Sequence, residues 1–394
     1  MKAVPGPWLR LTASAASAAT LLAVVSGATG LDTAHRLLAA LAVPPLVALV
    51  ASAWLSYRRL LPAALAALLC FGAAALATEE VAHVAAASLA FAAMAVLTGH
   101  AFRAERAPRA QWRDYVTLTK PRIMSLLLLT GFCGLVVGAR GFPAWWITVV
   151  TMIGLALACG GASALNHVLD RDIDRLMGER TRARPVAAER MAPSHALEFG
   201  LALSAFSFVL LGSAVNVLTA ALALVGNLFY VLVYTRVLKR WTPQNIVIGG
   251  AAGAVPPLVG YAAATGDLAL PALWLFLIVF FWTPPHFWTL AILLKENYAA
   301  ARVPMLPVVR GVRATTKQIV LYSILLVALS AAPFFAGTFG VAYLAAALAL
   351  GGVFLALAVQ LRRTTTPRGA ALLFHYSLLY LALLFVAMAL DVAV

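Results

Sequence analysis

Three oxygen-bearing side chains recur at intervals of four residues in one charged stretch of the chain. They are Asn166, Asp170 and Asp174. On a helix this spacing turns each side chain by only about 40° from the one before, so all three project from one face. Amide and carboxylate oxygens are hard ligands, and a site with few protein ligands favours Mg²⁺ that is also held by substrate phosphates. The spacing therefore predicts a magnesium site, with Asp172 turned away from it toward solvent.

Arginines crowd the same stretch and offer the opposite chemistry. Guanidinium groups bind the oxygens of a diphosphate through forked hydrogen bonds. The alternative is a basic loop that only obeys the charge rule of membrane proteins, and the arginines alone do not separate the two. The aspartates favour a functional site, because carboxylates at membrane depth are energetically costly and are usually part of a binding or catalytic site. We assign Arg171 to catalysis, and Arg182 and Arg184 to substrate binding.

The rest of the chain predicts a membrane environment for this cluster. Hydrophobic residues make up 63% of the 394 residues, and charged residues only 11%. Apolar runs near the ~20 residues needed to cross a bilayer recur throughout, and lipid forces such runs to be helices. We predict about thirteen transmembrane helices and therefore an all-α polytopic membrane protein.

The placement of basic residues predicts the orientation. With the N-terminus on the cytoplasmic side, nearly all of the 29 Lys and Arg residues fall on that side, and only Arg36 and Arg140 fall outside. The net charge of +15 thus reflects the positive-inside rule and does not indicate nucleic acid. We expect a multi-pass protein of the cell inner membrane with cytoplasmic active-site loops, since no transit segment precedes the first span.

A charged segment divides the chain into two parts. Residues 103–114 hold several arginines and a proline, which is typical of a linker. Residues 1–102 form a predicted N-terminal domain of four helices with few charges. Residues 115–394 form a predicted second domain of nine helices, whose cytoplasmic connections carry nearly all of the distinctive polar residues.

Three further cytoplasmic edges of the second domain carry polar motifs. They read TLTKPRIMS at residues 117–125, YTRVLKRWTPQNIVIGG at 234–250 and FWTPPHFWTLAILLKENYAAARVPMLPVV at 281–309. Basic residues at such helix ends either contact diphosphate or snorkel to the interface. Pro284 and Pro285 should break their span and re-aim His286. Our candidates are Lys120 and Arg122 for catalysis, and Lys239, Arg240 and the aromatic wall residue Tyr234 for substrate binding.

Together with NHVLDRDIDR, these stretches resemble the UbiA superfamily of intramembrane prenyltransferases and, within it, the haem O synthases, or protohaem IX farnesyltransferases. The motifs TKPR, NxxxDxxxD, TxxRP, YTxxLKRxTPQNIVIGG, PPHFW and PMLPVV follow in that order. The resemblance implies a UbiA-type bundle of nine helices, preceded here by about four extra spans. It also implies binding of Mg²⁺, farnesyl diphosphate and haem b, and farnesyl transfer to a haem vinyl group.

The resemblance also assigns roles to single residues. It implies substrate contacts for Asn245, which could otherwise be a helix cap, and for His286, which alone is more often a packing residue. Members of the superfamily usually carry a second acidic motif where this chain reads KENY, with Asn297 in place of an acid. This departure puts a second metal site in question and leaves Lys295 and Tyr298 as candidate phosphate contacts.

Two histidines predict a haem site in the N-terminal domain. His35 and His83 begin alternate predicted helices at the extracytoplasmic end, where paired imidazoles could hold a haem iron. Their strings AHRLLAAL and AHVAAASL weakly resemble one half of a haem A synthase, a family that consumes haem O. The alternative is plain helix packing. The expected partners are lipid, the two substrates, and haem A synthase or cytochrome oxidase assembly factors.

Two other functions fit the same residues. A related prenyltransferase could act on a quinone-ring or chlorin acceptor, although TPQNIVIGG and PPHFW favour haem. A non-catalytic carrier of haem or lipid would interrupt its helices at the midplane, whereas the charges here gather at cytoplasmic helix ends.

Overall fold

The computed structural model describes residues 110–393 without a gap, and also residues 13, 15–17, 19–20, 45–50, 64–65 and 67–68. Most of the predicted N-terminal domain and linker, including His35 and His83, lies outside the described residues. From residue 110 onward the helices are α5 (Trp112–Thr119), α6 (Pro121–Ala139), α7 (Trp145–Leu169), α8 (Arg171–Leu176), α9 (Glu179–Arg182), α10 (Pro193–Ala214), α11 (Val217–Leu228), the π-helix η2 (Phe229–Leu238), α12 (Lys239–Trp241), α13 (Asn245–Gly253), α14 (Val255–Thr265), α15 (Leu270–Leu293), α16 (Lys295–Ala300), α17 (Leu306–Val309), α18 (Gly311–Phe335), α19 (Val341–Thr364) and α20 (Pro367–Ala393).

Within residues 110–393, 9 helical stretches are long and apolar enough to cross a membrane. Two of them combine shorter helices: Val217–Trp241 contains α11, η2 and α12, and Asn245–Thr265 contains α13 and α14. Their number equals the nine helices predicted for residues 115–394. The agreement has a physical cause, since a backbone surrounded by lipid must satisfy its own hydrogen bonds and so becomes helical wherever the chain is apolar for long enough.

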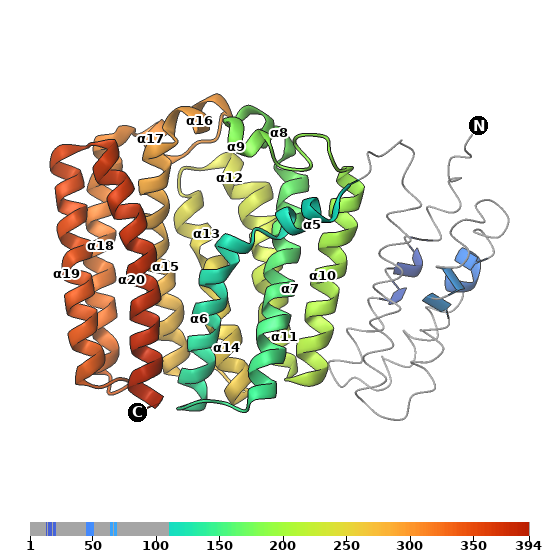
Figure 1. Cartoon of the computed structure of the whole chain (residues 1–394), viewed down its shortest axis with the longest axis horizontal. Helices are drawn as coiled ribbons and strands as arrows, with labels where there is room; N and C mark the ends of the chain where they lie inside the picture. The colour runs from blue at the N-terminus through green and yellow to red at the C-terminus, as the bar shows by residue number, and fades with distance from the viewer. Residues whose placement is uncertain are drawn as a thin grey trace.

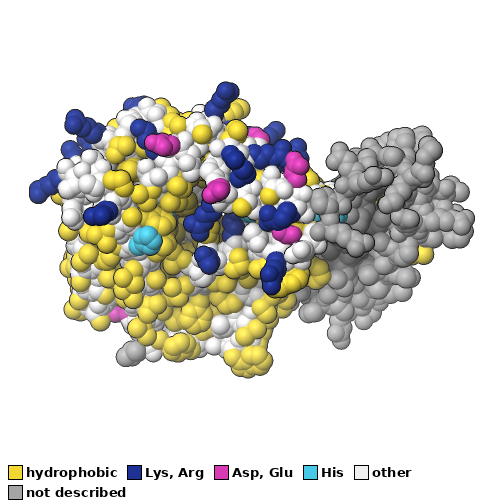
Figure 2. Space-filling view, turned by 45° about the horizontal axis from the view of Figure 1, so that its top comes forward, with side chains coloured by type: hydrophobic (Ala, Val, Ile, Leu, Met, Phe, Trp, Pro, Cys, Tyr) yellow, Lys and Arg dark blue, Asp and Glu magenta, His cyan; other side chains and the backbone are white. Residues whose placement is uncertain are grey.

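The long helices stand side by side, and the short helices α8, α9, α12, α16 and α17 gather at one end of the bundle, at the top of Figure 1. Helix α5 lies across the bundle near the same end. Lys, Arg, Asp and Glu side chains crowd this end, whereas hydrophobic side chains cover the flank below it (Figure 2). The polar connections are thus collected at one membrane face.

Helices α6 and α14 approach closely because glycines lie at their contact. A Cβ atom at Gly260 would overlap the carbonyl oxygen of Gly131, and one at Gly134 would overlap the carbonyl oxygen of Pro257. Helices in a membrane associate largely through close packing of this kind, since lipid supplies no hydrophobic drive between them. Helix α6 also contacts α7 and α20, so this pair joins the beginning of the domain to its end.

We expect Gly260→Ala to lower the stability of the bundle by about 1–3 kcal/mol, because its methyl group can fit only if backbone moves. The midpoint of thermal unfolding in detergent measures the effect. Gly253→Ala is the matched control, since a Cβ there meets no heavy atom within 4 Å. Equal midpoints for the two variants would show that the α6–α14 contact is not tight.

Helix α15 runs without a break from Leu270 to Leu293, although it contains Pro284 and Pro285. The prediction that these prolines break the span is wrong. Both prolines are buried, and α15 packs against α13, α18 and α20. Transmembrane helices tolerate proline where neighbouring helices support the affected turn. The register of an intact helix, and not a break, therefore determines where His286 points.

Candidate functional site

The three predicted metal ligands lie at a bend and not on one continuous helix. Helix α7 ends at Leu169 and α8 begins at Arg171, with Asp170 between them at φ −92° and ψ 5°. These angles lie in the sparsely populated bridge region, which ends regular helix. Helical hydrogen bonds continue across the bend, from Asp170 N–H to Asn166 O (2.9 Å) and from Asp174 N–H to Asp170 O (2.8 Å). Asn166, Asp170 and Asp174 are all buried.

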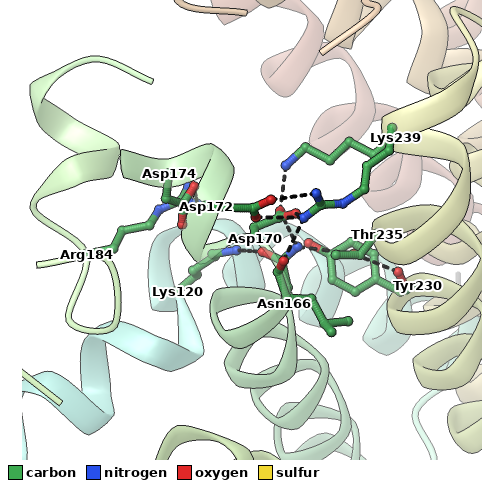
Figure 3. A network of polar contacts seen from close by, with 11 residues as sticks. Lys120, Asn166, Asp170, Asp172, Asp174, Arg184, Tyr230, Thr235 and Lys239 are labelled. Carbon is green, nitrogen blue, oxygen red and sulfur yellow. Dashed lines mark hydrogen bonds and ion pairs between the residues drawn. The ribbon is translucent and has the colours of Figure 1, made fainter. Parts of the chain in front are cut away.

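Lysines from two distant segments bind the first two of these residues (Figure 3). Lys120, between α5 and α6, donates from Nζ to Asn166 Oδ1 over 2.8 Å. Asn166 Nδ2 donates to Asp170 Oδ2 over 2.8 Å. Lys239 Nζ lies 2.5 Å from the same Asp170 oxygen. The bundle thus brings together two cations and a carboxylate that are far apart in the sequence.

Two arginines pair with the two other aspartates of this stretch. Arg184 Nη1 pairs with Asp174 Oδ1 at 2.7 Å. Arg240 forms a forked pair with Asp172, at 2.7 and 2.8 Å, and also donates to the carbonyl oxygen of Leu169 over 2.7 Å. Asp172 is exposed, as predicted, but it is held by Arg240. Arg240 therefore clamps α12 to the bend between α7 and α8.

Several buried polar atoms at the site have no hydrogen-bond partner. They are Asp170 Oδ1, Asp174 Oδ2 and Arg240 Nε. Both side-chain polar atoms of the buried Asn245, at the start of α13, are likewise without a partner. Asn245 begins α13 without capping it, so the capping alternative is wrong. Unpaired buried oxygens are costly unless a ligand satisfies them, and two carboxylates with the neighbouring amide of Asn166 suit a hard cation. The residues present therefore fit Mg²⁺.

The protein oxygens at this site are too few to fill the coordination shell of a Mg²⁺ ion, so the substrate would have to supply the remaining ligands. Among the described residues, no group of three or more His, Cys, Asp or Glu side chains could hold a metal ion. A cation at this bend would rest on few protein oxygens and would take its other ligands from phosphate, as Mg²⁺ commonly does. The second acidic motif is absent in the described α16 as well, where Asn297 lies against Gly178.

The electrostatics of the site favour an anion. Burial, together with the neighbouring Arg184, lowers the pKa of Lys120 to about 7. Burial raises the pKa of Asp174, and the pairing with Arg184 opposes that rise. A lysine crowded by other cations is stabilised in its charged form when a negative group binds beside it. The arrangement suits a metal-bound diphosphate.

Other predicted site residues lie outside this network. Arg122, Arg171, Arg182 and Lys295 are exposed at the charged end. Tyr298 is buried and Tyr234 is partly buried, stacked on Tyr230 with ring centroids 5.6 Å apart. The roles assigned to these residues stay predictions.

His286 occupies a separate aromatic environment between α15 and α20. Its ring is stacked between Trp282, at 4.3 Å, and Phe374, at 4.8 Å. Nδ1 lies 2.6 Å from Ser377 Oγ, and Ser377 donates its proton to the carbonyl oxygen of Phe374. A hydroxyl has one proton to donate, so Nδ1–H must be the donor to Ser377. The lone pair of His286 is therefore on Nε2.

Sequence reasoning missed two residues of these networks. Thr235 accepts a hydrogen bond from Asn166 Nδ2 over 3.1 Å, and Ser377 orients His286. Thr235 stands inside the YTRVLKR motif, which was a usable signal. Ser377 lies in an apolar span with no motif around it, so only packing identifies it.

About 70% of the chain matches known proteins in sequence, as 71% does for the first relative below. The profile of the UbiA prenyltransferase family matches residues 127–388. A protoheme IX farnesyltransferase of Symbiobacterium thermophilum is 56% identical over 282 residues, which are 71% of this chain and 94% of that protein. One from Thermus thermophilus is 50% identical over 285 residues, which are 72% of this chain but only 47% of the relative. The match thus spans about half the length of the Thermus protein.

Solved structures share the fold. A digeranylgeranylglyceryl phosphate synthase aligns with a TM-score of 0.60 at 18% identity, over 71% of this chain and 98% of that structure. A UbiA homologue from Archaeoglobus fulgidus, solved with DMAPP and Mg²⁺, aligns with a TM-score of 0.51 at 17% identity, over 70% of this chain and 99% of that structure. At these identities the likeness concerns the fold alone.

Proposed function

The chain belongs to the UbiA prenyltransferase family, and we propose that it transfers a farnesyl group from farnesyl diphosphate to a vinyl group of haem b, which gives haem O. One observation carries the proposal: buried carboxylates with unpaired oxygens stand among Lys120, Arg184 and Lys239 at one end of the bundle. This arrangement suits a metal-bound diphosphate. The name of the relative that is 56% identical supports the choice of farnesyl donor and haem acceptor.

The proposed reaction joins C1 of the farnesyl group to one vinyl carbon and a water oxygen to the other. The bond between C1 of the farnesyl group and the diphosphate oxygen breaks, and its electron pair leaves with diphosphate. The vinyl π electrons then form a bond to C1, which leaves positive charge on the vinyl carbon next to the porphyrin ring. Water adds to that carbon and loses a proton, which leaves a hydroxyl group. Farnesyl diphosphate, haem b and water thus give haem O, diphosphate and a proton.

The cations of the site promote the first of these steps. Lys120, Arg184 and Lys239 are held in place before the reaction, and so they can stabilise charge on the departing diphosphate without reorganisation. Asn166, Asp170 and Asp174 would hold Mg²⁺, which neutralises diphosphate charge when bound. Tyr230 and Tyr234 both lie on η2, and their rings are stacked. Aromatic faces of this kind stabilise an allylic cation.

The charged end of the bundle faces the cytoplasm in this proposal, and the protein resides in the cell inner membrane. The excess of Lys and Arg supports this orientation. Haem A synthase and oxidase assembly factors are the partners we propose, because they would accept the product. Haem binding by His35 and His83 stays a prediction.

The proposed function is tested by incubating the purified chain with haem b, farnesyl diphosphate and Mg²⁺. We expect the mass of the extracted haem to increase by one farnesyl group plus one hydroxyl group. Parallel reactions offer a quinone-ring precursor and a chlorin as acceptor. Prenylation of one of these, with haem b unchanged, would refute the haem assignment and leave the prenyltransferase chemistry in place.

We further propose that His286 binds the iron of haem b through Nε2. A histidine that binds a metal characteristically donates its other ring N–H to an oxygen, which fixes the tautomer and orients the ring. His286 has this arrangement through Ser377. The flanking rings of Trp282 and Phe374 hold the imidazole plane in place.

We expect His286→Ala to weaken binding of haem b by about tenfold or more, since losing a ligand bond of ~1.4 kcal/mol already has that effect. Binding of iron-free protoporphyrin IX should change little, because it has no iron to bind. Absorbance titration of both porphyrins measures the difference. His375→Ala is the control, since His375 is exposed on the same helix as Phe374. Equal losses for both porphyrins would argue for packing and against ligation.

A further inference from the structure

The helix that carries Thr235 has an unusual geometry. Residues Phe229–Leu238 form the π-helix η2 in the second half of the span Val217–Trp241. Most π-helices are single-turn bulges and they often mark functional sites. This one faces α7 at the level of Asn166, and Figure 3 shows Tyr230 and Thr235 beside that residue. The deviation from α-helix thus lies where the candidate metal ligands are held.

Thr235 is fully buried and its hydroxyl has two defined partners. Oγ1 donates to the carbonyl oxygen of Tyr230, five residues earlier, over 2.9 Å. The same Oγ1 accepts from Asn166 Nδ2 over 3.1 Å. Because its only proton goes to Tyr230, the hydroxyl can only accept from Asn166. The π-helical carbonyl therefore determines the direction of the bond to Asn166.

This bond is one of three that orient the Asn166 amide. Asp170 Oδ2 also accepts from Nδ2, and Lys120 Nζ donates to Oδ1. Each of these three partners is restricted to one role in the hydrogen bond. The Thr235 hydroxyl and the Asp170 carboxylate can only accept from Asn166, and the Lys120 ammonium group can only donate to it. A flipped amide would place its oxygen against the carboxylate and the hydroxyl lone pairs. All three contacts therefore direct Oδ1 toward the cationic centre of the site.

The position of η2 is itself fixed by close packing. A Cβ atom at Gly249 on α13 would overlap the Tyr234 ring. The ring thus lies directly on the α13 backbone, which leaves η2 little freedom to rotate. Thr235 follows Tyr234 in the chain, so its hydroxyl is presented to Asn166 from a rigid support.

We propose that Thr235 is a positioning residue that fixes the amide of Asn166, so that Oδ1 is presented to the divalent cation and its diphosphate. The inference rests on the proposed function, because it requires a cation at Asn166 and Asp170. Thr235 does not touch the substrate in this proposal. It acts through Asn166, in the way that outer-shell partners of a metal site orient the ligands themselves.

The test compares Mn²⁺ binding to the purified full chain by electron paramagnetic resonance, with no substrate present. Thr235→Val keeps the side-chain shape but cannot accept from Asn166, and we expect it to bind Mn²⁺ about 10–100-fold more weakly. Thr235→Ser keeps the hydroxyl and should bind like the wild type. Thr315→Val is the matched control, because Thr315 is equally buried but bonds only to the carbonyl oxygen of Gly311.

A second readout follows the Mg²⁺ dependence of turnover. Thr235→Val should require more Mg²⁺ for half-maximal rate and recover much of its rate at saturation, whereas general damage would lower the rate at every concentration. Thr235→Ala also removes the hydroxyl and introduces a smaller side chain. It replaces Thr235→Val in both measurements if the valine variant does not fold. Unchanged Mn²⁺ affinity in either folded variant overturns the role of Thr235. Failure of the wild type to bind Mn²⁺ overturns the metal assignment itself, and with it this inference.

Discussion

Asp170→Asn is expected to lower the rate of haem farnesylation by about 10²–10³-fold, the range seen when one preorganised group that stabilises charge is removed. The substitution keeps the shape of the side chain and removes its charge. Asp170 is fully buried, with Oδ2 shared by Asn166 and Lys239 and Oδ1 without a hydrogen-bond partner. It is therefore the candidate ligand most completely enclosed by the site.

The measurement is the initial rate of farnesylated haem formation at saturating Mg²⁺. Asp172→Asn supplies the matched control, because it makes the same chemical change two residues away on an exposed side chain. That variant removes the charge from the forked pair with Arg240 at the surface and leaves the buried oxygens of Asp170 and Asp174 in place. If the two variants were equally active, Asp170 would not be part of the catalytic site.

Lys239→Met is expected to reduce both stability and activity. Lys239 is buried and its Nζ lies 2.5 Å from Asp170 Oδ2, while Arg240 Nη2 is 4.0 Å from the other carboxylate oxygen. Removing one partner of a buried ion pair leaves an uncompensated charge, which costs about 3–5 kcal/mol. We expect a loss of this size in the free energy of unfolding. The diphosphate would lose one of its cations as well.

A double variant separates the two effects. Lys239→Met combined with Asp170→Asn removes both charges, so it should recover much of the lost stability while farnesylation stays low. Thermal unfolding in detergent and the farnesylation assay give the two readouts. Arg236→Met is the control, because Arg236 is an exposed base on the same π-helix. A single Lys239→Met variant as stable as the Arg236 variant would mean that the buried pair does not support the fold.

The nine spans within residues 110–393 were predictable because lipid imposes one rule on the whole chain. Any apolar stretch of sufficient length must become a helix, whatever its neighbours are. The bend at Asp170 and the continuity of α15 through Pro284 and Pro285 were not predictable in this way. Both depend on contacts from other helices, which can override the local preference of a few residues.

The identities of the site residues were visible in the sequence, but their pairing was not. Acids at four-residue spacing and bases at helix ends predicted metal and diphosphate chemistry. Which lysine binds which oxygen-bearing side chain depends on contacts between residues far apart in the chain, such as Lys239 with Asp170 and Lys120 with Asn166. The π-helix that carries Thr235, and Ser377 beside His286, likewise follow from packing alone. The sequence determines the chemical type of each side chain, whereas the direction of that side chain is determined only when the helices around it have packed.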